Sequence, residues 1–265
     1  DGQNTLQSSV SWETRFNSQF PYISQVGKPT GMMYGFIYDG TYKAEDFDDK
    51  GNLVSGVPSF KGNTMQPGDM KYRDMNGDGV IDDYDRTIIG CGQPLNTGGF
   101  GNNFNWKNFD LNIFFAWSYG NDVLNANRLV FESGWKSQTN QLASYANRWS
   151  PENPTSNIPR VNAVGREEYS SRVIEDGSFL RLKNVSLGYT LPQQITRKAH
   201  IEKLRIYVSG ENLFFWSPLK KYAKNYDPEM ITAGDADFAS TTGTDGQGYG
   251  YPMTRSVTIG LNINF

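Results

Sequence analysis

Strict alternation of apolar and polar side chains is the feature that most constrains what this chain can fold into. In Val257–Phe265 the odd positions are apolar and the even positions are small or polar. The same period of two recurs in Asp110–Tyr119, Val185–Leu191 and Leu204–Ser209. Because successive side chains of a β-strand point to opposite faces, the pattern predicts strands that each have one apolar and one polar face.

The polar faces of these strands have an unusual composition. They are rich in Asn, Ser, Gly and Thr, whereas sheet faces that meet bulk water usually carry Lys and Glu. Uncharged polar residues are typical of the wall of a water-filled lumen. Aromatic residues make up 14% of the chain. They lie towards the strand ends, as in the interfacial girdles of a membrane protein.

The spacing of the strands gives a second, independent signal. Six segments have the pattern, near residues 4–16, 96–106, 109–120, 178–191, 203–215 and 255–265. Three connections are long, at residues 17–95, 121–177 and 216–254. The other two, Lys107–Asn108 and residues 192–202, are short. In outer-membrane barrels short turns are periplasmic and long loops extracellular. The sequence therefore predicts an all-β fold: a portion of an antiparallel transmembrane β-barrel with long extracellular loops. A soluble β-sandwich, whose strands also alternate, is the alternative fold.

Residue counts exclude several classes of function. Cys91 is the only cysteine, so no internal disulfide can form, and His200 is the only histidine. A catalytic triad or a multi-histidine zinc site is therefore not expected. The carboxylates show no spacing diagnostic of a glycosidase pair, and a net charge of −3 gives no basic excess for nucleic acid. We expect no enzyme activity. No apolar run of about 18 residues predicts a transmembrane helix, but barrel strands need only about 9–11 residues.

Residues 74–85 read Asp-Met-Asn-Gly-Asp-Gly-Val-Ile-Asp-Asp-Tyr-Asp, which is the spacing of a calcium loop of the EF-hand type. The expected ligands are oxygen donors at alternate positions of the loop: Asp74, Asn76, Asp78, the backbone carbonyl of Val80, Asp82 and Asp85. Gly79 permits the sharp turn, and Asp85 stands where such loops usually carry Glu. The sequence predicts one structural calcium ion in the long loop 17–95. A solvated, metal-free acidic turn is the alternative.

The same loop lies in a stretch that resembles a known family of bacterial proteins. Pro67–Gly90 looks like a signature stretch of the SusC/RagA-type TonB-linked outer-membrane transporters. Further segments are similar to the same family, in the same order along the chain: Gly99–Phe104, Lys107–Leu111, Tyr119–Asp122, Arg148–Pro154, Glu175–Tyr189 and Ser209–Leu213. The resemblance covers nearly the whole chain.

The resemblance implies that residues 1–265 are the C-terminal part of a TonB-dependent receptor barrel of roughly 22 strands, about six of which lie here. The plug domain and the TonB box of the family are absent from this sequence. The family actively imports oligosaccharides or peptides across the bacterial cell outer membrane. Its partners would be a SusD-like surface lipoprotein, TonB through the missing N-terminal part, the remaining strands and plug, and membrane lipid.

A protein of another class fits part of the pattern. A secreted, soluble β-domain with a dockerin-like calcium loop, which binds carbohydrate or a protein scaffold, would also alternate and also carry the acidic loop. Dependence of the native protein on detergent distinguishes the two hypotheses.

Overall fold

The computed structural model describes residues 22–23, 25, 27–29, 32–125, 127–134, 140–221, 227–229 and 253–265. The chain divides into two compact units, which are described separately. The sheet unit comprises residues 94–121, 176–230 and 251–265, and the connection unit comprises residues 1–93, 122–175 and 231–250. The strand expected near 4–16, with Val10–Phe16, lies outside the described residues.

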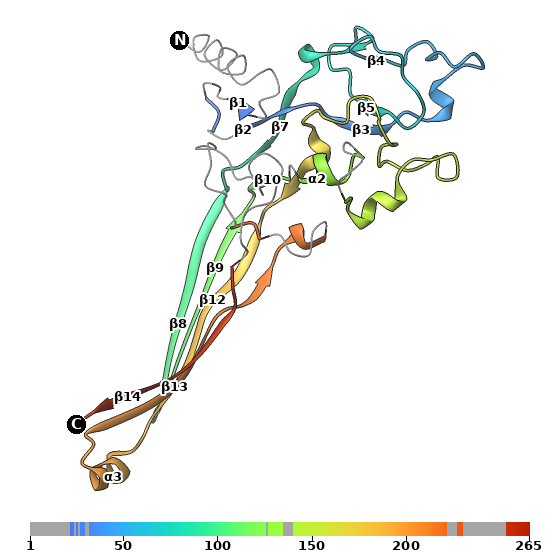
Figure 1. The fold of residues 1–265 in the computed structure, drawn as a ribbon. Coiled ribbons are helices and arrows are strands. Elements are labelled where there is room, and N and C mark those ends of the chain that lie inside the picture. Colours follow the sequence, from blue (N-terminus) through green and yellow to red (C-terminus); the bar gives the residue numbers. More distant parts are fainter. Residues whose placement is uncertain are drawn as a thin grey trace. The chain divides into compact units, whose positions relative to one another are not determined.

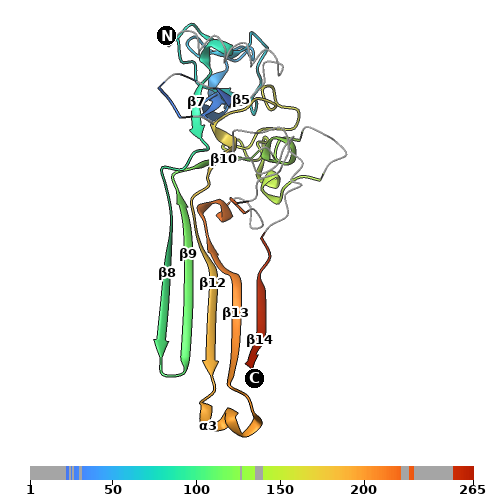
Figure 2. The ribbon, with the colours of Figure 1, turned by 90° about the vertical axis from the view of Figure 1, so that its left-hand side faces the viewer.

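The sheet unit is one antiparallel sheet of five strands in the order β14-β13-β12-β9-β8. The strands are β8 (Asn96–Trp106), β9 (Phe109–Tyr119), β12 (Phe179–Thr190), β13 (Lys203–Trp216) and β14 (Ser256–Asn264). Figure 2 shows them side by side, with the C-terminus at the same end of the sheet as the short helix α3 (Gln193–Thr196). Five of the six expected strands are therefore confirmed, to within two residues at each end.

The register places a row of apolar residues, drawn from all five strands, on one face. Leu111 of β9 lies opposite Leu187 of β12 and Phe104 of β8. Leu187 lies opposite Val208 of β13, and Val208 lies opposite Ile259 of β14. Because directly opposed residues of antiparallel strands share a face, these side chains form one apolar row across the sheet.

A β-bulge in β12 keeps this face continuous. The register of β12 against β9 shifts between Leu182 and Asn184, so Lys183 is an extra residue. Leu182 and Val185 consequently share a face although they are three residues apart. Alternation alone does not predict such an insertion, because one added residue would otherwise move every following side chain to the opposite face.

The short turns of the sheet unit agree with the sequence. Lys107–Asn108 is a tight turn between β8 and β9, with Lys107 in the left-handed region at φ 52°. The connection from β12 to β13 holds α3 and the 3₁₀ turn η5 (Arg197–Ala199). His200 follows η5 at φ 57° and caps that turn through its backbone N–H to the Arg197 carbonyl. The lone histidine therefore has a local structural role.

The connection unit contains regular secondary structure, although the sequence predicts long loops there. It contains three small sheets built from β1 (Tyr22–Ile23), β2 (Met32–Gly35), β3 (Tyr38–Thr41), β4 (Ser59–Phe60), β5 (Met70–Tyr72), β6 (Val80–Ile81) and β7 (Thr87–Cys91). A further pair is β10 (Asp122–Leu124) with β11 (Ile174–Asp176). Helical elements are α2 (Asn127–Phe131), η1 (Ala44–Asp46), η2 (Asp83–Asp85), η3 (Ala143–Asn147) and η4 (Ser171–Val173), and η6 (Pro218–Lys221) belongs to the sheet unit. Figure 1 labels β1–β5, β7, β10 and α2 among these elements.

The hydrophobic cores lie in the connection unit. The larger cluster is formed by eight buried residues, Phe36, Tyr42, Phe60, Met65, Met70, Tyr72, Ile81 and Ala163. A second cluster gathers Tyr22, Met33, Leu124, Leu129 and Val173. Residues 17–95 and 121–177 therefore supply most of the buried apolar surface among the described residues. None of the helices in the described residues is long and apolar enough to cross a membrane.

Candidate functional site

The apolar face of the five-stranded sheet is uncovered. Ile259 is 78% exposed and Leu261 is 60% exposed, and Val208, Leu187 and Phe104 are also exposed. Large exposed side chains run from strand to strand across the whole face. A soluble monomer rarely leaves a contiguous apolar surface of this extent open to water. The face is therefore a surface that meets either lipid or another protein.

Aromatic side chains mark both ends of this apolar face. At the turn end Trp106 stacks on Phe109 at 6.4 Å, and Phe109 lies 4.6 Å from Tyr189 between ring centroids. Lys107 extends over the Trp106 ring at 4.8 Å. At the opposite end Tyr119 and Trp216 are exposed. Rings with a polar edge suit the boundary between an apolar layer and water.

The opposite face of the sheet is polar and internally bonded. Arg205 of β13 forms a bidentate ion pair with Asp110 of β9, and the pair passes over Gly188 of β12. A Cβ at Gly188 would lie 2.4 Å from the Arg205 Nη2 atom. Asn112 donates to Asn103 on β8. The face therefore presents amides and matched charges, as the Asn- and Ser-rich pattern indicates.

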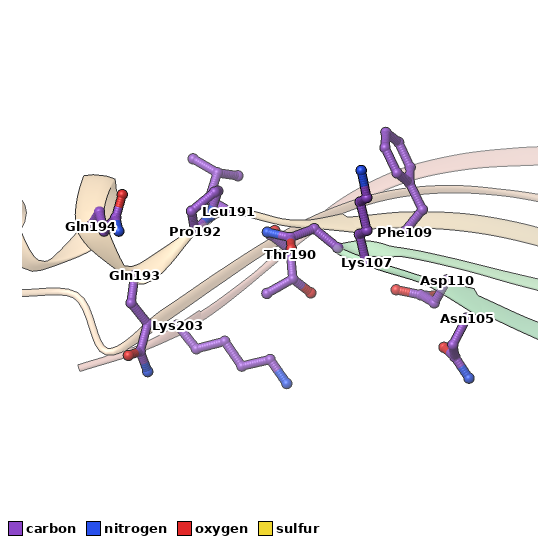
Figure 3. A pocket seen from close by; sticks show the side chains of 11 residues that line it. Asn105, Lys107, Phe109, Asp110, Thr190, Leu191, Pro192, Gln193, Gln194 and Lys203 are labelled. Atoms are coloured by element: carbon purple, nitrogen blue, oxygen red, sulfur yellow. The ribbon is translucent and has the colours of Figure 1, made fainter.

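A polar pocket lies where this face reaches the short turns. It has a volume of about 690 Å³, and its lining includes Asn105, Asp110, Thr190, Gln194 and Lys203. Figure 3 shows Lys203 and Gln193 extending to one side of the ribbon, and Lys107 and Phe109 to the other. Its lining contains no histidine or cysteine, and its amide, hydroxyl and charged side chains support binding by hydrogen bonds and charge.

The acidic loop 74–85 is folded tightly by its own side chains. Asp74 accepts the backbone N–H of Gly77 at 2.6 Å and of Gly79 at 2.8 Å. Asn76 accepts the N–H of Asp78, and Asp78 accepts the N–H of Val80. The N–H of Gly79, followed by that of Gly77, holds the pKa of Asp74 below its ordinary value, so this carboxylate stays anionic.

The remaining expected ligands close the loop. Asp85 is buried and accepts the N–H of Met75 through Oδ1 and of Asp82 through Oδ2, each at 2.8 Å. The carbonyls of Gly79 and Ile81 accept N–H groups from the neighbouring segment 59–61. In an extended segment carbonyls alternate in direction, so the Val80 carbonyl between them faces the other side.

The loop brings the six expected ligands into one turn but does not form a ready-made metal centre from acidic side chains alone. Across the described part of the chain, no three His, Cys, Asp or Glu side chains converge to hold a metal ion. The loop also has amide and carbonyl oxygens that can ligate a metal ion, and each oxygen that accepts an N–H keeps a second lone pair. Asp74, Asn76, Asp78 and Val80 are also accessible to solvent to different degrees. The residues present are therefore compatible with a calcium ion.

Comparisons with known proteins decide between the two classes of function. No protein-family model matches the chain. TonB-dependent receptor P3 of Formosa agariphila is 38% identical over 92% of this chain and 23% of its own length. TonB-dependent receptor SusC of Bacteroides thetaiotaomicron is 27% identical over 76% of the chain and 18% of its length.

The chain belongs to the SusC-type TonB-dependent receptors. It spans about a quarter of the length of the curated relatives it matches. A structure of the RagAB peptide transporter superposes with a TM-score of 0.67 at 23% identity, over 92% of this chain and 24% of that chain. The RagAB peptide importer in its closed-closed state gives a TM-score of 0.65 at 25% identity, again over 92% of this chain and 24% of that chain. The family named from the sequence resemblance is confirmed.

The signature stretch of this receptor segment has a structural basis that the sequence did not reveal. Gly68 has φ +88°, and a Cβ there would lie 2.5 Å from the Trp149 ring. Asp69 is fully buried, pairs with Arg160 at 2.8 Å and accepts the backbone N–H of Gln66 and Val164. Positions far apart in sequence thus meet around one turn. Only the glycine, as a residue that tolerates positive φ, could have been anticipated.

The sequence also did not predict a cluster of buried charged side chains. Arg172 pairs with Glu132 at 2.8 Å, Arg128 pairs with both Glu132 and Glu175, and the Arg172 and Glu132 side chains are at most 5% exposed. Burial raises the pKa of Glu175, and the nearby Arg128 opposes that rise. The two positive and two negative groups balance. The cluster ties α2 to η4.

Proposed function

We propose that this receptor segment forms part of the wall of a transmembrane β-barrel in the bacterial outer membrane. The apolar face of the sheet lies against lipid, and the polar face lines the passage. The observation that carries the proposal is one continuous, exposed apolar face opposite a polar face with matched charges. A strand with alternating lipid-facing and lumen-facing residues has this appearance.

The strand length fits a membrane. β9 has 11 residues. At about 3.4 Å per residue and a tilt of about 40°, eleven residues rise about 28 Å along the membrane normal. The apolar band of outer-membrane barrels is about 25 Å tall. The aromatic side chains at the two ends of the sheet then lie near the two interfaces.

The edges of the sheet support closure by other strands. β14 and β8 are the outer strands of the sheet in the described residues. An unpaired backbone N–H or C=O in lipid costs several kcal/mol. Both edges therefore pair with strands outside the described residues in a closed barrel, for which the family resemblance implies roughly 22 strands. On this arrangement the Lys107–Asn108 turn is periplasmic, and the long connections at residues 17–95, 121–177 and 216–254 are extracellular.

The transport activity follows from the family and the surfaces. The receptor imports an oligosaccharide or a peptide, powered through TonB, together with a SusD-like surface lipoprotein that delivers the substrate. The likeness to a peptide transporter supports a peptide as one substrate class. No catalytic group is required, because the segment supplies only a wall, a polar passage and extracellular structure.

The acidic loop carries a structural calcium ion in this proposal. Asp74, Asn76, Asp78, the Val80 carbonyl, Asp82 and Asp85 are its ligands. The ion would stiffen the turn by drawing these oxygens together, and it would add to the hydrogen bonds already present rather than replace them. This role concerns stability and not substrate chemistry.

Neighbouring positions on β14 test the orientation of the sheet. Single cysteines are introduced at Leu261 and at Asn262 of the receptor in outer membranes, in a Cys91→Ser background. A lipid-soluble maleimide should modify the Leu261→Cys variant and a membrane-impermeant one should not, whereas Asn262→Cys should show the opposite preference or remain shielded in the passage. Rapid modification of Leu261→Cys by the impermeant reagent would refute a lipid-facing position.

A further inference from the structure

Four charged side chains meet on the polar face of the sheet, at the end from which the long connections leave. Arg181 of β12 is 2% exposed and pairs with both Asp227 and Glu229. Lys183 donates to the two carboxylate oxygens of Glu229 at 2.7 and 2.9 Å. Asp227 and Glu229 lie within the connection from β13 to β14, and their backbone is fixed by a bond from the Glu229 N–H to the Asp227 carboxylate. We call Asp227–Glu229 the strap.

The strand is shaped to hold this strap. Lys183 is the bulge residue of β12, and it follows Arg181 by two positions. A bulge redirects the side chain it carries, and here it brings a second cation to the same carboxylate. The guanidinium of Arg181 lies 4.5 Å from the Phe215 ring and 5.9 Å from the Phe179 ring. The two rings, which contact each other at 6.5 Å between centroids, limit the directions that this guanidinium can take.

Burial makes these contacts more than a surface ion pair. Asp227 and Pro228 are buried although they belong to a connection. Exposed ion pairs contribute little to stability, whereas removal of one partner from a buried pair leaves an uncompensated charge. The two cations and the two carboxylates balance, so none of the four charges is left without an opposite.

We propose that Arg181 and Lys183 form a charge clasp that fixes the strap as a permanent part of the passage wall. This inference rests on the proposed function for the meaning of the polar face, because that face lines the passage only in a barrel. The clasp has two consequences there. The connection after β13 is anchored beside the extracellular mouth. The buried Arg181 guanidinium is hidden from an anionic substrate that enters, whereas Lys183 is half-buried.

Cysteine protection in the intact receptor tests the clasp without any substrate. Pro228→Cys is placed in the Cys91→Ser background, and its rate of labelling by a membrane-impermeant maleimide is measured on whole cells. With the clasp intact the cysteine is buried and labels slowly. Arg181→Gln should raise the labelling rate by about tenfold or more, because a buried carboxylate loses its partner. Glu229→Gln, which leaves the strand untouched, should raise it as well.

Matched variants separate release of the strap from loosening of the sheet. Arg205→Gln removes another Arg–Asp pair from the same polar face and should leave the labelling of Pro228→Cys unchanged. Arg181→Lys, which keeps a positive charge opposite Asp227 and Glu229, should label more slowly than Arg181→Gln. Fast labelling with the clasp intact, no change in Arg181→Gln, or an equal rise in Arg205→Gln would each overturn the clasp. None of these outcomes bears on whether Leu261 faces lipid, so the clasp and the proposed function fail separately.

Discussion

Leu261→Arg is the substitution whose effect depends most on what covers the apolar face. Leu261 lies four residues before Phe265 on β14 and is 60% exposed. Four residues at about 3.4 Å and a tilt of about 40° place it about 10 Å along the membrane normal from Phe265. Half of an apolar band about 25 Å tall is about 12 Å. Leu261 therefore lies near the midplane if Phe265 lies at the interface.

The expected cost follows from this depth. An arginine at the midplane of an outer-membrane barrel destabilises it by about 2–4 kcal/mol. In water the same change at an exposed leucine would stay within about 0.5 kcal/mol. Thr258→Arg is the matched control, because it adds the same side chain to the polar face of the same strand, opposite the uncharged Ser209.

The assay compares guanidinium unfolding midpoints of the receptor reconstituted in phospholipid vesicles, followed by tryptophan fluorescence. Leu261→Arg should lower the midpoint clearly, and Thr258→Arg should leave it close to the unsubstituted receptor. Equal midpoints for Leu261→Arg and the unsubstituted receptor would refute the placement of this face in lipid.

Three further predictions concern the sheet, the loop and the buried cluster. Gly260→Ala places a Cβ 2.4 Å from the Tyr207 ring, whereas a Cβ at Gly101 would have its nearest atom 3.5 Å away. In the same unfolding assay we expect a cost of about 1–3 kcal/mol for Gly260→Ala and below about 0.5 kcal/mol for Gly101→Ala. Similar costs for the two variants would contradict the packing. Asp78→Asn should weaken calcium-dependent protection of the loop from proteolysis and Asp83→Asn should not, while a loop that calcium does not protect would rule out the ion. The pKa of Asp74 lies below its ordinary value in the folded loop. The ionised carboxylate therefore stabilises the loop at every pH above the ordinary pKa of aspartate, and this stabilisation is lost only as the pH falls through the lowered pKa. Protection of the loop from proteolysis at pH 5 should therefore equal that at pH 7. Arg172→Gln removes one of the two arginines that pair with the buried Glu132 and should cost about 1–3 kcal/mol, seen as faster proteolysis of the connection unit. Arg73→Gln, at the exposed pair with Asp39, should leave the proteolysis rate unchanged. Equal proteolysis rates for the two variants would contradict the buried pair.

The long strands could be predicted from the sequence because each has nine or more residues of one repeating pattern. β14 follows it throughout, and β8, β9 and β13 follow it apart from Asn102 in β8, Phe114 in β9 and Asn212–Trp216 in β13. β12 departs from the pattern at its bulge, because Lys183 and Asn184, which lie between Leu182 and Val185, are both polar. The small strands of the connection unit, such as β5 and β6, have two or three residues, too few to show a period.

The contacts that hold the connections together could not be predicted because they join distant positions. Asp69 and Arg160 are 91 residues apart, and Arg181 and Asp227 are 46 apart. A single sequence gives the charge of each side chain but not its partner. The calcium loop could be recognised from the sequence because its expected ligands lie within twelve consecutive residues. The calcium ion itself remains a prediction.

A structure of the receptor in lipid nanodiscs, determined by electron cryo-microscopy, tests the central claim most directly. We expect the lipid annulus to lie against Leu111, Leu187, Val208 and Ile259, and the outer edges of β8 and β14 to be hydrogen-bonded to further strands of a closed barrel. A second protein layer packed on this apolar face, with β8 or β14 left as an open edge, would contradict the account.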